Sequence, residues 1–374
     1  MHNFEKIFNI QNHSDFKKQC LDIYHFQYQN NYVYQNYCNM ICENPININE
    51  INKIPFLPIS FFKTKKILSV DKFEKVFYSS GTTTKSRSKH FISDLKLYQE
   101  SFINNFRLNY GNINQYTILA LLPNYYENKD SSLIYMADKL IHLTKSNESG
   151  FYLDDYSKLS KKLIELDIKN ERKTILIGVP YALLDLIDFN QFQLNNTIIM
   201  ETGGMKGKRK EMVRKELHEK LKLGFGVKKI HSEYGMTELL SQAYSQGDGV
   251  FKTPFWMKAF IRDINDAQNL DFNKKSGAIN IIDLANYNSC SFIATDDMGK
   301  FVNDDEFEVI GRIDNSDLRH VVRRAFITEN FPYAEIQDNI IGENLVPIDM
   351  LRLKLSFFGA LKFDPRSDKW LRIC

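Results

Sequence analysis

Short apolar runs alternate with amphipathic segments through the middle of the chain. The apolar runs have the length and β-branched content of buried strands: EKVFYSS (74–80), YTILALLP (116–123), KTILIGVP (173–180), TIIMETGG (197–204) and VKKIHSEYG (227–235). The segments between them have helical periodicity: LKLYQESFINNFRL (95–108), SLIYMADKLIHL (132–143), LLDLIDF (183–189) and KGKRKEMVRKELHEKLK (206–222). The pattern predicts an α/β fold in which a parallel sheet is covered by helices on both faces.

The two ends of the chain follow different patterns. Residues 1–50 place aromatic and aliphatic side chains at helical spacing, and the two prolines of IPFLPISFFK (54–63) predict an extended segment. From about residue 250 short strands predominate, which predicts a smaller β-rich subdomain over 250–312. The last fifty residues have no clear period.

Composition excludes several classes of protein. The chain has 374 residues, 43% of them apolar and 25% charged, which is typical of a globular protein. A net charge of +3 gives no overall field that attracts nucleic acid or an anionic membrane. Because no long apolar run or secretory signal is present and the five cysteines are irregularly spaced, we expect a cytoplasmic protein without a disulfide framework.

One stretch, FYSSGTTTKSRSKHF (77–91), points to an anion. Six small residues, Ser79 to Thr84, follow a predicted strand and precede Lys85 and further basic residues. Backbone amides in such a turn converge on phosphate oxygens, and a lysine neutralises charge. A flexible Ser/Thr linker is the alternative. The GxxxxGK[ST] pattern of a Walker-type NTPase is not present in the sequence.

Three later segments carry chemistry that suits a nucleotide. HSEYGMTELL (231–240) offers an aromatic ring, a hydroxyl and a carboxylate; FIATDDMGK (292–300) ends a strand with acidic residues; and FEVIGRIDNSDLR (307–319) supplies an arginine. Singly, each segment is also compatible with a turn or a solvated charge.

Together and in this order, the four motifs resemble those of the adenylate-forming superfamily, which includes acyl-CoA synthetases, luciferases and peptide-synthetase adenylation domains. IPFLPISFFK, METGGMKGKRKEM, HSEYGMTELLSQAYS and GRIDNSDLR narrow the resemblance to its LuxE-like acyl-protein synthetase branch. The similarity spans residues near 50 to 320. It implies a catalytic domain over 1–312 and a hinge with a short C-terminal segment over 313–374, the C-terminal lid domain being reduced or absent.

The resemblance also implies ligands for ATP and Mg²⁺. The ATP phosphates would be held by Ser79, Ser80, Gly81, Thr82, Thr83, Thr84 and Lys85. Tyr234 would stack on adenine beside Gly235, and Thr237 would contact the α-phosphate. Glu238 would bind Mg²⁺.

Further roles follow from the other motifs. Asp296 would bind the ribose, Arg312 the ribose or a phosphate, and Asp314 would act as the hinge. Gly203 and Gly204 would form a turn that lines adenine and the acyl pocket. Of these residues, Lys85, Thr237, Glu238 and Arg312 are the expected catalytic ones.

Other polar residues near the motifs have simpler interpretations. Lys206 and Lys208 read as the solvated start of a helix, and His231 as a packing or pocket residue. His90 and Asp94 form an HxxxD pattern, but it ends a loop and caps a helix, which favours a structural role over acyl-transfer catalysis.

The chain departs from the branch at two places. Thr84 stands where relatives carry glycine, which disfavours a positive φ there. His320–Val322 stand where the branch continues with Gly-Cys-Ser, and a frameshift near residue 319 is one hypothesis for the aperiodic tail. Cys374 is an alternative acyl acceptor, and Lys362 and Lys369 are alternatives to the late catalytic lysine of acyl-CoA synthetases.

The resulting hypothesis is an enzyme that activates a carboxylic, expected fatty, acid as an acyl-adenylate and transfers it to a protein thiol. An acyl- or aryl-CoA ligase is the alternative within enzymes. An inactive adenylate-fold scaffold that binds an acyltransferase or reductase partner is the alternative of another class.

Overall fold

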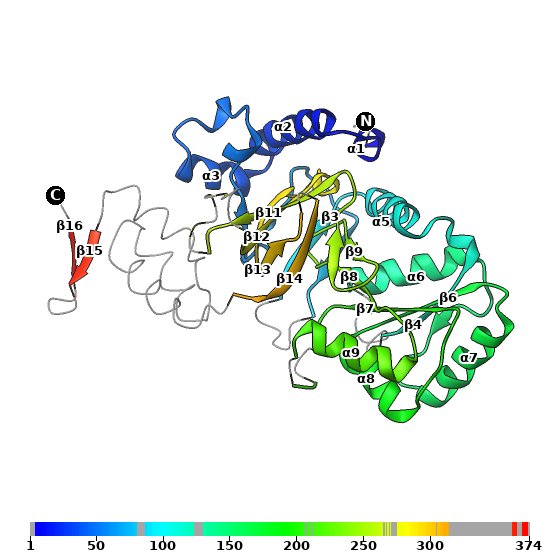
Figure 1. Ribbon diagram of the computed structural model, residues 1–374. Helices are drawn as coiled ribbons and strands as arrows, with labels where there is room; N and C mark the ends of the chain where they lie inside the picture. Colours follow the sequence, from blue (N-terminus) through cyan, green and yellow to red (C-terminus); the bar gives the residue numbers. More distant parts are fainter. Residues whose placement is uncertain are drawn as a thin grey trace.

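The computed structural model describes residues 4–80, 87–122, 130–205, 208–210, 212–264, 266, 268, 270, 275–303, 305–313, 361–364 and 369–372. Within these ranges the helices are α1 (Glu5–Phe8), α2 (His13–Asn30), α3 (Tyr32–Ile41), α4 (Phe61–Thr64), α5 (Leu95–Tyr110), α6 (Ser132–Thr144), α7 (Tyr156–Lys169), α8 (Pro180–Phe189) and α9 (Arg214–Phe225). Figure 1 shows their arrangement around a large sheet.

The strands fall into one large sheet and two hairpins. They are β1 (Leu57–Pro58), β2 (Lys75–Tyr78), β3 (Lys89–Ile92), β4 (Tyr116–Leu121), β5 (Gly150–Phe151), β6 (Lys173–Gly178), β7 (Thr197–Thr202), β8 (His231–Tyr234), β9 (Ala243–Ser245), β10 (Val250–Lys252), β11 (Met257–Arg262), β12 (Ser276–Asp283), β13 (Phe292–Phe301), β14 (Glu306–Arg312), β15 (Leu361–Asp364) and β16 (Lys369–Arg372). The large sheet has the order β11-β12-β13-β14-β10-β9-β8-β7-β6-β4-β5, with β1 beside β13.

The strands β5, β4, β6, β7 and β8 are parallel, as the alternating pattern predicts. Every residue of β4 and β7 is buried, because helices cover both faces. Helices α7, α8 and α9 pack in sequence along one face, and α6 lies with α5 on the other (Figure 1). The connection that follows β4 leads to β5 on one side, whereas the connection that follows β6 leads to β7 on the other side. Such a reversal of direction opens a ligand crevice at the carboxyl ends of the strands.

The β-rich part continues this sheet. Strand β9 pairs antiparallel with β8, and β10, β14, β13, β12 and β11 follow in antiparallel order. One sheet thus joins the parallel strands to the predicted β-rich subdomain. The division of the chain at residue 312 stays a prediction.

The N-terminal helices cover the antiparallel part (Figure 1). Tyr24 and Tyr34 pack against Phe292 of β13 with ring centroids about 6 Å apart (6.1 and 5.9 Å). Gln27 of α2 donates to the backbone oxygens of Asn286 and Tyr287 at 3.0 and 2.8 Å. Such contacts make α2 and α3 part of the same core as the sheet.

Three local predictions need correction. The predicted extended segment 54–63 contains β1 but ends in the short helix α4, since its prolines lie before Ser60 and leave the following residues free to turn. The predicted helix 206–222 begins only at Arg214. Strands β2 and β3 form a separate antiparallel hairpin and are not members of the parallel sheet.

Candidate nucleotide site

Two predicted turns lie at one edge of the sheet. Strand β7 ends at Thr202 and is followed by Gly203 and Gly204, and the neighbouring parallel strand β8 ends at Tyr234. Gly203 has a φ of +75°, a conformation that favours glycine, and a Cβ on either glycine would meet nothing within 4 Å. Both glycines therefore face open space next to the Tyr234 turn.

Tyr234 joins this edge to the antiparallel strands. Its hydroxyl donates to the Asp297 carboxylate of β13 at 2.8 Å, and its ring packs on Phe251 and Phe307. Asp297 lies opposite Arg312 of β14 in register, and the two form an ion pair at 3.4 Å. Burial raises the pKa of Asp297, while Arg312 and the Tyr234 hydroxyl lower it. Three motifs distant in sequence thus meet at one carboxylate.

Asp297, and not the predicted Asp296, occupies this position. Successive residues of a strand face opposite sides, so Asp296 faces away from Tyr234 and is only partly buried. Its backbone oxygen accepts a hydrogen bond from the Ile313 amide at 2.8 Å. The motif TDD alone offered both carboxylates, and only the strand's orientation distinguishes them.

Glu238 lies buried behind the Tyr234 turn with an exposed fraction of 6%. Burial raises the pKa of its carboxyl, and a hydrogen bond from the Ser88 side chain lowers it. Thr237, the preceding residue, is bound through its backbone oxygen to His90 at 2.8 Å. Thr237 and Glu238 therefore contact the strand that follows the predicted phosphate loop.

Only the base of the phosphate loop is described. The Ser79 amide donates to the Ser88 oxygen at 3.0 Å, the Ser88 amide donates to Ser79 Oγ at 2.9 Å, and Arg87 donates to the Ser79 carbonyl. Ser80 is exposed. The predicted roles of Gly81, Thr82, Thr83, Thr84 and Lys85 concern residues outside those that the structure describes, as do the predictions for Lys206, Asp314, His320–Val322 and Cys374.

A buried polar cluster supports the segment after Glu238, and sequence reasoning missed it. Asp283 accepts hydrogen bonds from the Leu240 and Ser241 amides at 2.9 and 2.8 Å and from the Ser241 hydroxyl at 2.6 Å. Asn286 donates to the Glu238 oxygen at 2.8 Å. Burial raises the pKa of Asp283 to about 6, although the hydrogen bonds from Leu240 and Ser241 lower it. The partners are more than forty residues apart along the chain, so no sequence signal identified them.

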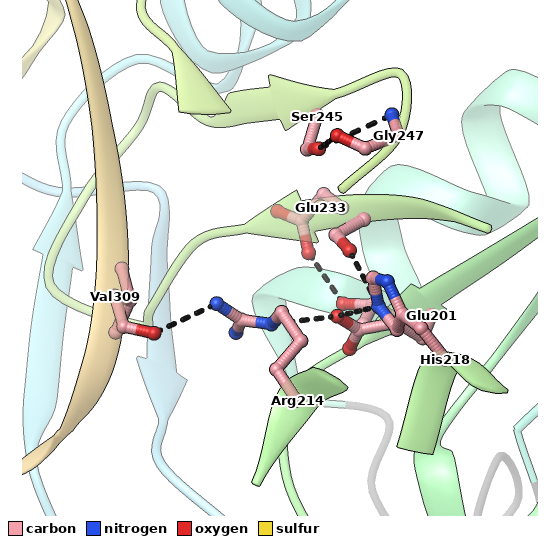
Figure 2. A network of polar contacts seen from close by, with 9 residues as sticks. Glu201, Arg214, His218, Glu233, Ser245, Gly247 and Val309 are labelled. Atoms are coloured by element: carbon pink, nitrogen blue, oxygen red, sulfur yellow. Dashed lines mark hydrogen bonds and ion pairs between the residues drawn. The ribbon is translucent and has the colours of Figure 1, made fainter. Parts of the chain in front are cut away.

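A second polar network joins strands β7 and β8 to helix α9 and strand β14 (Figure 2). Thr202 donates to the Glu233 carboxyl, and burial, with Glu201 nearby, raises the pKa of Glu233 to about 7. Arg214 of α9 binds Glu201 at 3.2 Å and the Val309 oxygen of β14 at 2.9 Å. The network links both turns to helix α9 and strand β14.

Among the other polar residues singled out in the sequence, Asp94, His90 and His231 make capping or packing contacts. Asp94 caps α5 by accepting from the Lys96 amide at 2.8 Å, whereas buried His90 binds Thr237 and Ser289. His231 packs on Tyr110 with its Nδ1 3.2 Å from the hydroxyl, and burial lowers the pKa of His231 to about 4. Lys208 is exposed. Lys362 and Lys369 lie on β15 and β16.

Metal and membrane features are limited in the part of the chain that the structure describes. No group of three or more His, Cys, Asp or Glu side chains there is placed to hold a metal ion, and the metal role of Glu238 stays a prediction. Among the described helices, none combines the length and apolar character needed to cross a bilayer.

Solved structures with this architecture define the class. The chain resembles 2-hydroxyisobutyryl-CoA ligase in an open conformation, with a TM-score of 0.57 and 11% identity over 81% of this chain and 75% of that chain. The same ligase in its postadenylation state has a TM-score of 0.58 and 10% sequence identity. That match covers 81% of this chain and 68% of the ligase. MatB from Rhodopseudomonas palustris has a TM-score of 0.48 and 16% sequence identity, and this chain spans 50% of the length of MatB. The fold is that of the adenylate-forming enzymes.

A comparison with protein-family models assigns the chain to one family within this class. The model of the acyl-protein synthetase, LuxE family matches residues 6–325, so the chain belongs to that family. The long-chain-fatty-acid–luciferin-component ligase of Vibrio harveyi is 25% identical over 296 residues, 74% of this chain and 76% of that protein. The predicted resemblance is confirmed, and with it the class of acyl-adenylate-forming ligases.

Proposed function

We propose that this chain uses ATP to activate a fatty or other hydrophobic carboxylic acid as an acyl-adenylate and passes the acyl group to a protein thiol. Family membership supports this activity. The observation that carries it is the meeting of Tyr234, Asp297 and Arg312 beside the open Gly203–Gly204 turn.

These residues fit a nucleotide. The glycines leave room for a ring or sugar to approach the backbone. The Tyr234 ring is buried against Phe251 and Phe307, so in this proposal adenine contacts only its remaining exposed part. Asp297 is the carboxylate that we assign to the ribose hydroxyls, with Arg312 as a planar donor beside it. The phosphates would extend toward the hairpin base at Ser79, where the roles of Lys85 and the loop residues stay a prediction.

The charges of the substrate carboxylate and of the ATP phosphates decide which catalytic groups the reaction needs. The substrate carboxylate is already ionised, so it attacks the α-phosphorus without a general base, and pyrophosphate leaves in line. Thr237 donates to the α-phosphate and Arg312 offsets the growing negative charge. A Mg²⁺ ion held by Glu238 would neutralise the phosphate oxygens during this step. Glu238 offers a carboxylate oxygen, the kind of ligand that Mg²⁺ prefers.

The acceptor thiol belongs to another protein in this proposal. Cys20, Cys38 and Cys290 are buried and Cys42 is half-buried, and burial raises the pKa of all four thiols. A thiol in such surroundings is a poor nucleophile, since the thiolate reacts. Among the described residues, the cysteines are thus unsuited to carry the acyl group, and an acyl-carrier or reductase partner supplies it.

Acid-dependent exchange of labelled pyrophosphate into ATP tests this function. We expect exchange with one or more acids in a panel of chain lengths. The Asp297→Asn variant should show a KM for ATP raised roughly 10-fold, the loss of a charge-assisted hydrogen bond. Asp296→Asn is the matched control, one residue away on the other face, and should keep the wild-type KM.

Absence of exchange with every acid would favour the inactive scaffold. An equal effect of the two variants would contradict the ribose assignment. A product assay with CoA in place of a protein thiol separates the acyl-CoA ligase alternative.

A further inference from the structure

The strand after the phosphate loop contacts the Thr237–Glu238 segment through two side chains. Ser88 and His90 are both buried, whereas Lys89 between them is exposed, so they share one face of the strand. The Ser88 side chain bonds to the Glu238 carboxyl, and His90 Nδ1 lies 2.8 Å from the Thr237 oxygen. One face of β3 therefore meets both residues expected to act at the α-phosphate and the cation.

The surroundings of His90 fix its protonation pattern. A carbonyl oxygen only accepts hydrogen bonds, so Nδ1 carries the proton that binds Thr237. Nε2 accepts from the Ser289 hydroxyl at 2.8 Å. The ring also meets Phe62 of α4 edge-on, with centroids 5.4 Å apart. With both nitrogens bound and the ring packed, the side chain holds one orientation.

The same segment is held from the other side. Asn286 donates to the Glu238 oxygen, and Asp283 binds the Leu240 and Ser241 amides. These contacts fix the residues after Glu238, whereas His90 is the contact on the Thr237 carbonyl that comes from the hairpin carrying the phosphate loop. Without it, the Thr237 backbone loses this contact with the hairpin, and the Ser88 bond to the Glu238 side chain remains.

We propose that His90 is a positioning residue that ties the phosphate-loop hairpin to the Thr237–Glu238 segment through its hydrogen bond to the Thr237 carbonyl. The proposal deepens the adenylation function above and rests on it for its kinetic consequence. His90 contacts no reacting atom; it sets where Thr237 and Glu238 lie relative to the phosphates.

Two isosteric variants separate positioning from packing. In His90→Asn the amide nitrogen takes the place of Nδ1 and retains the donor to Thr237; in His90→Gln it takes the place of Nε2 and loses that donor. We expect His90→Gln to lower kcat of pyrophosphate exchange roughly 10- to 100-fold, the usual cost of losing an outer-shell partner. His90→Asn should recover most of this loss, and the KM for the acid should not change in either variant.

Two readouts do not depend on activity. Amide hydrogen exchange of residues 235–241 should accelerate in His90→Gln and stay slow in His90→Asn. In the wild-type protein, ¹⁵N NMR of the histidine rings should show His90 protonated at Nδ1.

The outcomes distinguish the two levels of the argument. Faster amide exchange in His90→Gln without any catalysed pyrophosphate exchange in the wild type would refute the proposed function and leave the contact intact. Equal amide exchange or equal kcat in both variants, with only the melting temperature lowered, would assign His90 to packing and overturn the inference. A wild-type ring protonated at Nε2 would also overturn it.

Discussion

Buried carboxyl groups determine much of this protein's chemistry at the scale of single residues. Glu233, Glu238, Asp283 and Asp297 are each almost inaccessible, and burial raises the pKa of each. Their partners differ: Asp283 accepts four hydrogen bonds, while Glu233 accepts one, from Thr202. Both carboxyl groups titrate in the folded protein, and Asp283 is in addition a structural anchor for the Leu240 and Ser241 amides.

Glu233 gives a pH-dependent stability. Its pKa of about 7 lies above the ordinary 4.5, so the folded state binds this proton more tightly than the unfolded chain. The stabilisation is complete below pH 4.5 and is lost as the pH rises through 7. Glu233→Gln can keep an acceptor for Thr202 but has no such proton. We expect the free energy of unfolding of the wild type, relative to this variant, to fall by about 3 kcal/mol from acid to mildly basic pH.

Denaturant unfolding of both proteins across this pH range measures the difference. Subtracting the variant removes the contribution of Asp283, which titrates in a neighbouring range. A difference that does not vary with pH would show that Glu233 is not titrating in the folded protein.

Sequence reasoning at this scale named segments more accurately than side chains. The four motifs supplied Tyr234 and Arg312, which the structure brings to one carboxylate. The resemblance assigned the ribose to Asp296, which stays a prediction, whereas the alternation of side chains along β13 places Asp297 at Tyr234. Asp283, Asn286 and Glu201 carried no signal, since their partners are distant in sequence and are defined only by the fold.

At the scale of elements, two helix ends show what their glycines do. Gly111 ends α5 and Gly226 ends α9, both with positive φ (+80° and +68°). A Cβ on Gly111 would meet nothing within 4 Å, whereas one on Gly226 would lie 2.7 Å from backbone atoms of Gln193 and Phe192. Both positions favour glycine for conformation, and Gly226 also requires it for space.

Gly226→Ala tests the requirement for space. The left-handed backbone at this position should cost about 1 kcal/mol of stability when alanine adopts it. The new Cβ should cost a further ~1–3 kcal/mol, because the chain segment beside it is backbone and must shift. Urea unfolding of the variant measures the loss. A loss of only about 1 kcal/mol would mean that the segment near Gln193 moves freely away from α9.

Elements with strong periodicity were predicted well. The parallel strands and helices α5, α6 and α8 appear where the pattern places them, and Asp94 caps α5 as expected. Helix α7 was not predicted although its Leu159, Leu163 and Leu166 form a buried stripe. The pairing of β2 with β3 was also missed, because an apolar run does not specify its partner.

At the scale of the whole molecule, one sheet brings the motifs together. The parallel strands supply the Gly203 and Tyr234 turns, the antiparallel strands supply Asp297 and Arg312, and the β2–β3 hairpin contributes Ser88 and His90. Helices α2 and α3 hold the antiparallel strands from outside (Figure 1). The proposed reaction needs all these parts, since nucleotide, cation and acid must meet in one place.

The central claim is that a carboxylate captures AMP from ATP at this place. An acid labelled with ¹⁸O in its carboxyl group tests it directly, with hydroxylamine as the acyl acceptor. Attack of a carboxylate oxygen on the α-phosphorus leaves that oxygen bridging acyl group and phosphate; hydroxylamine then takes the acyl carbon, and the oxygen departs with AMP.

Mass spectrometry of the nucleotide product gives the answer. We expect AMP carrying one ¹⁸O atom from the wild-type protein and almost none from Glu238→Gln. AMP without the label, or ADP with free phosphate, would contradict the account.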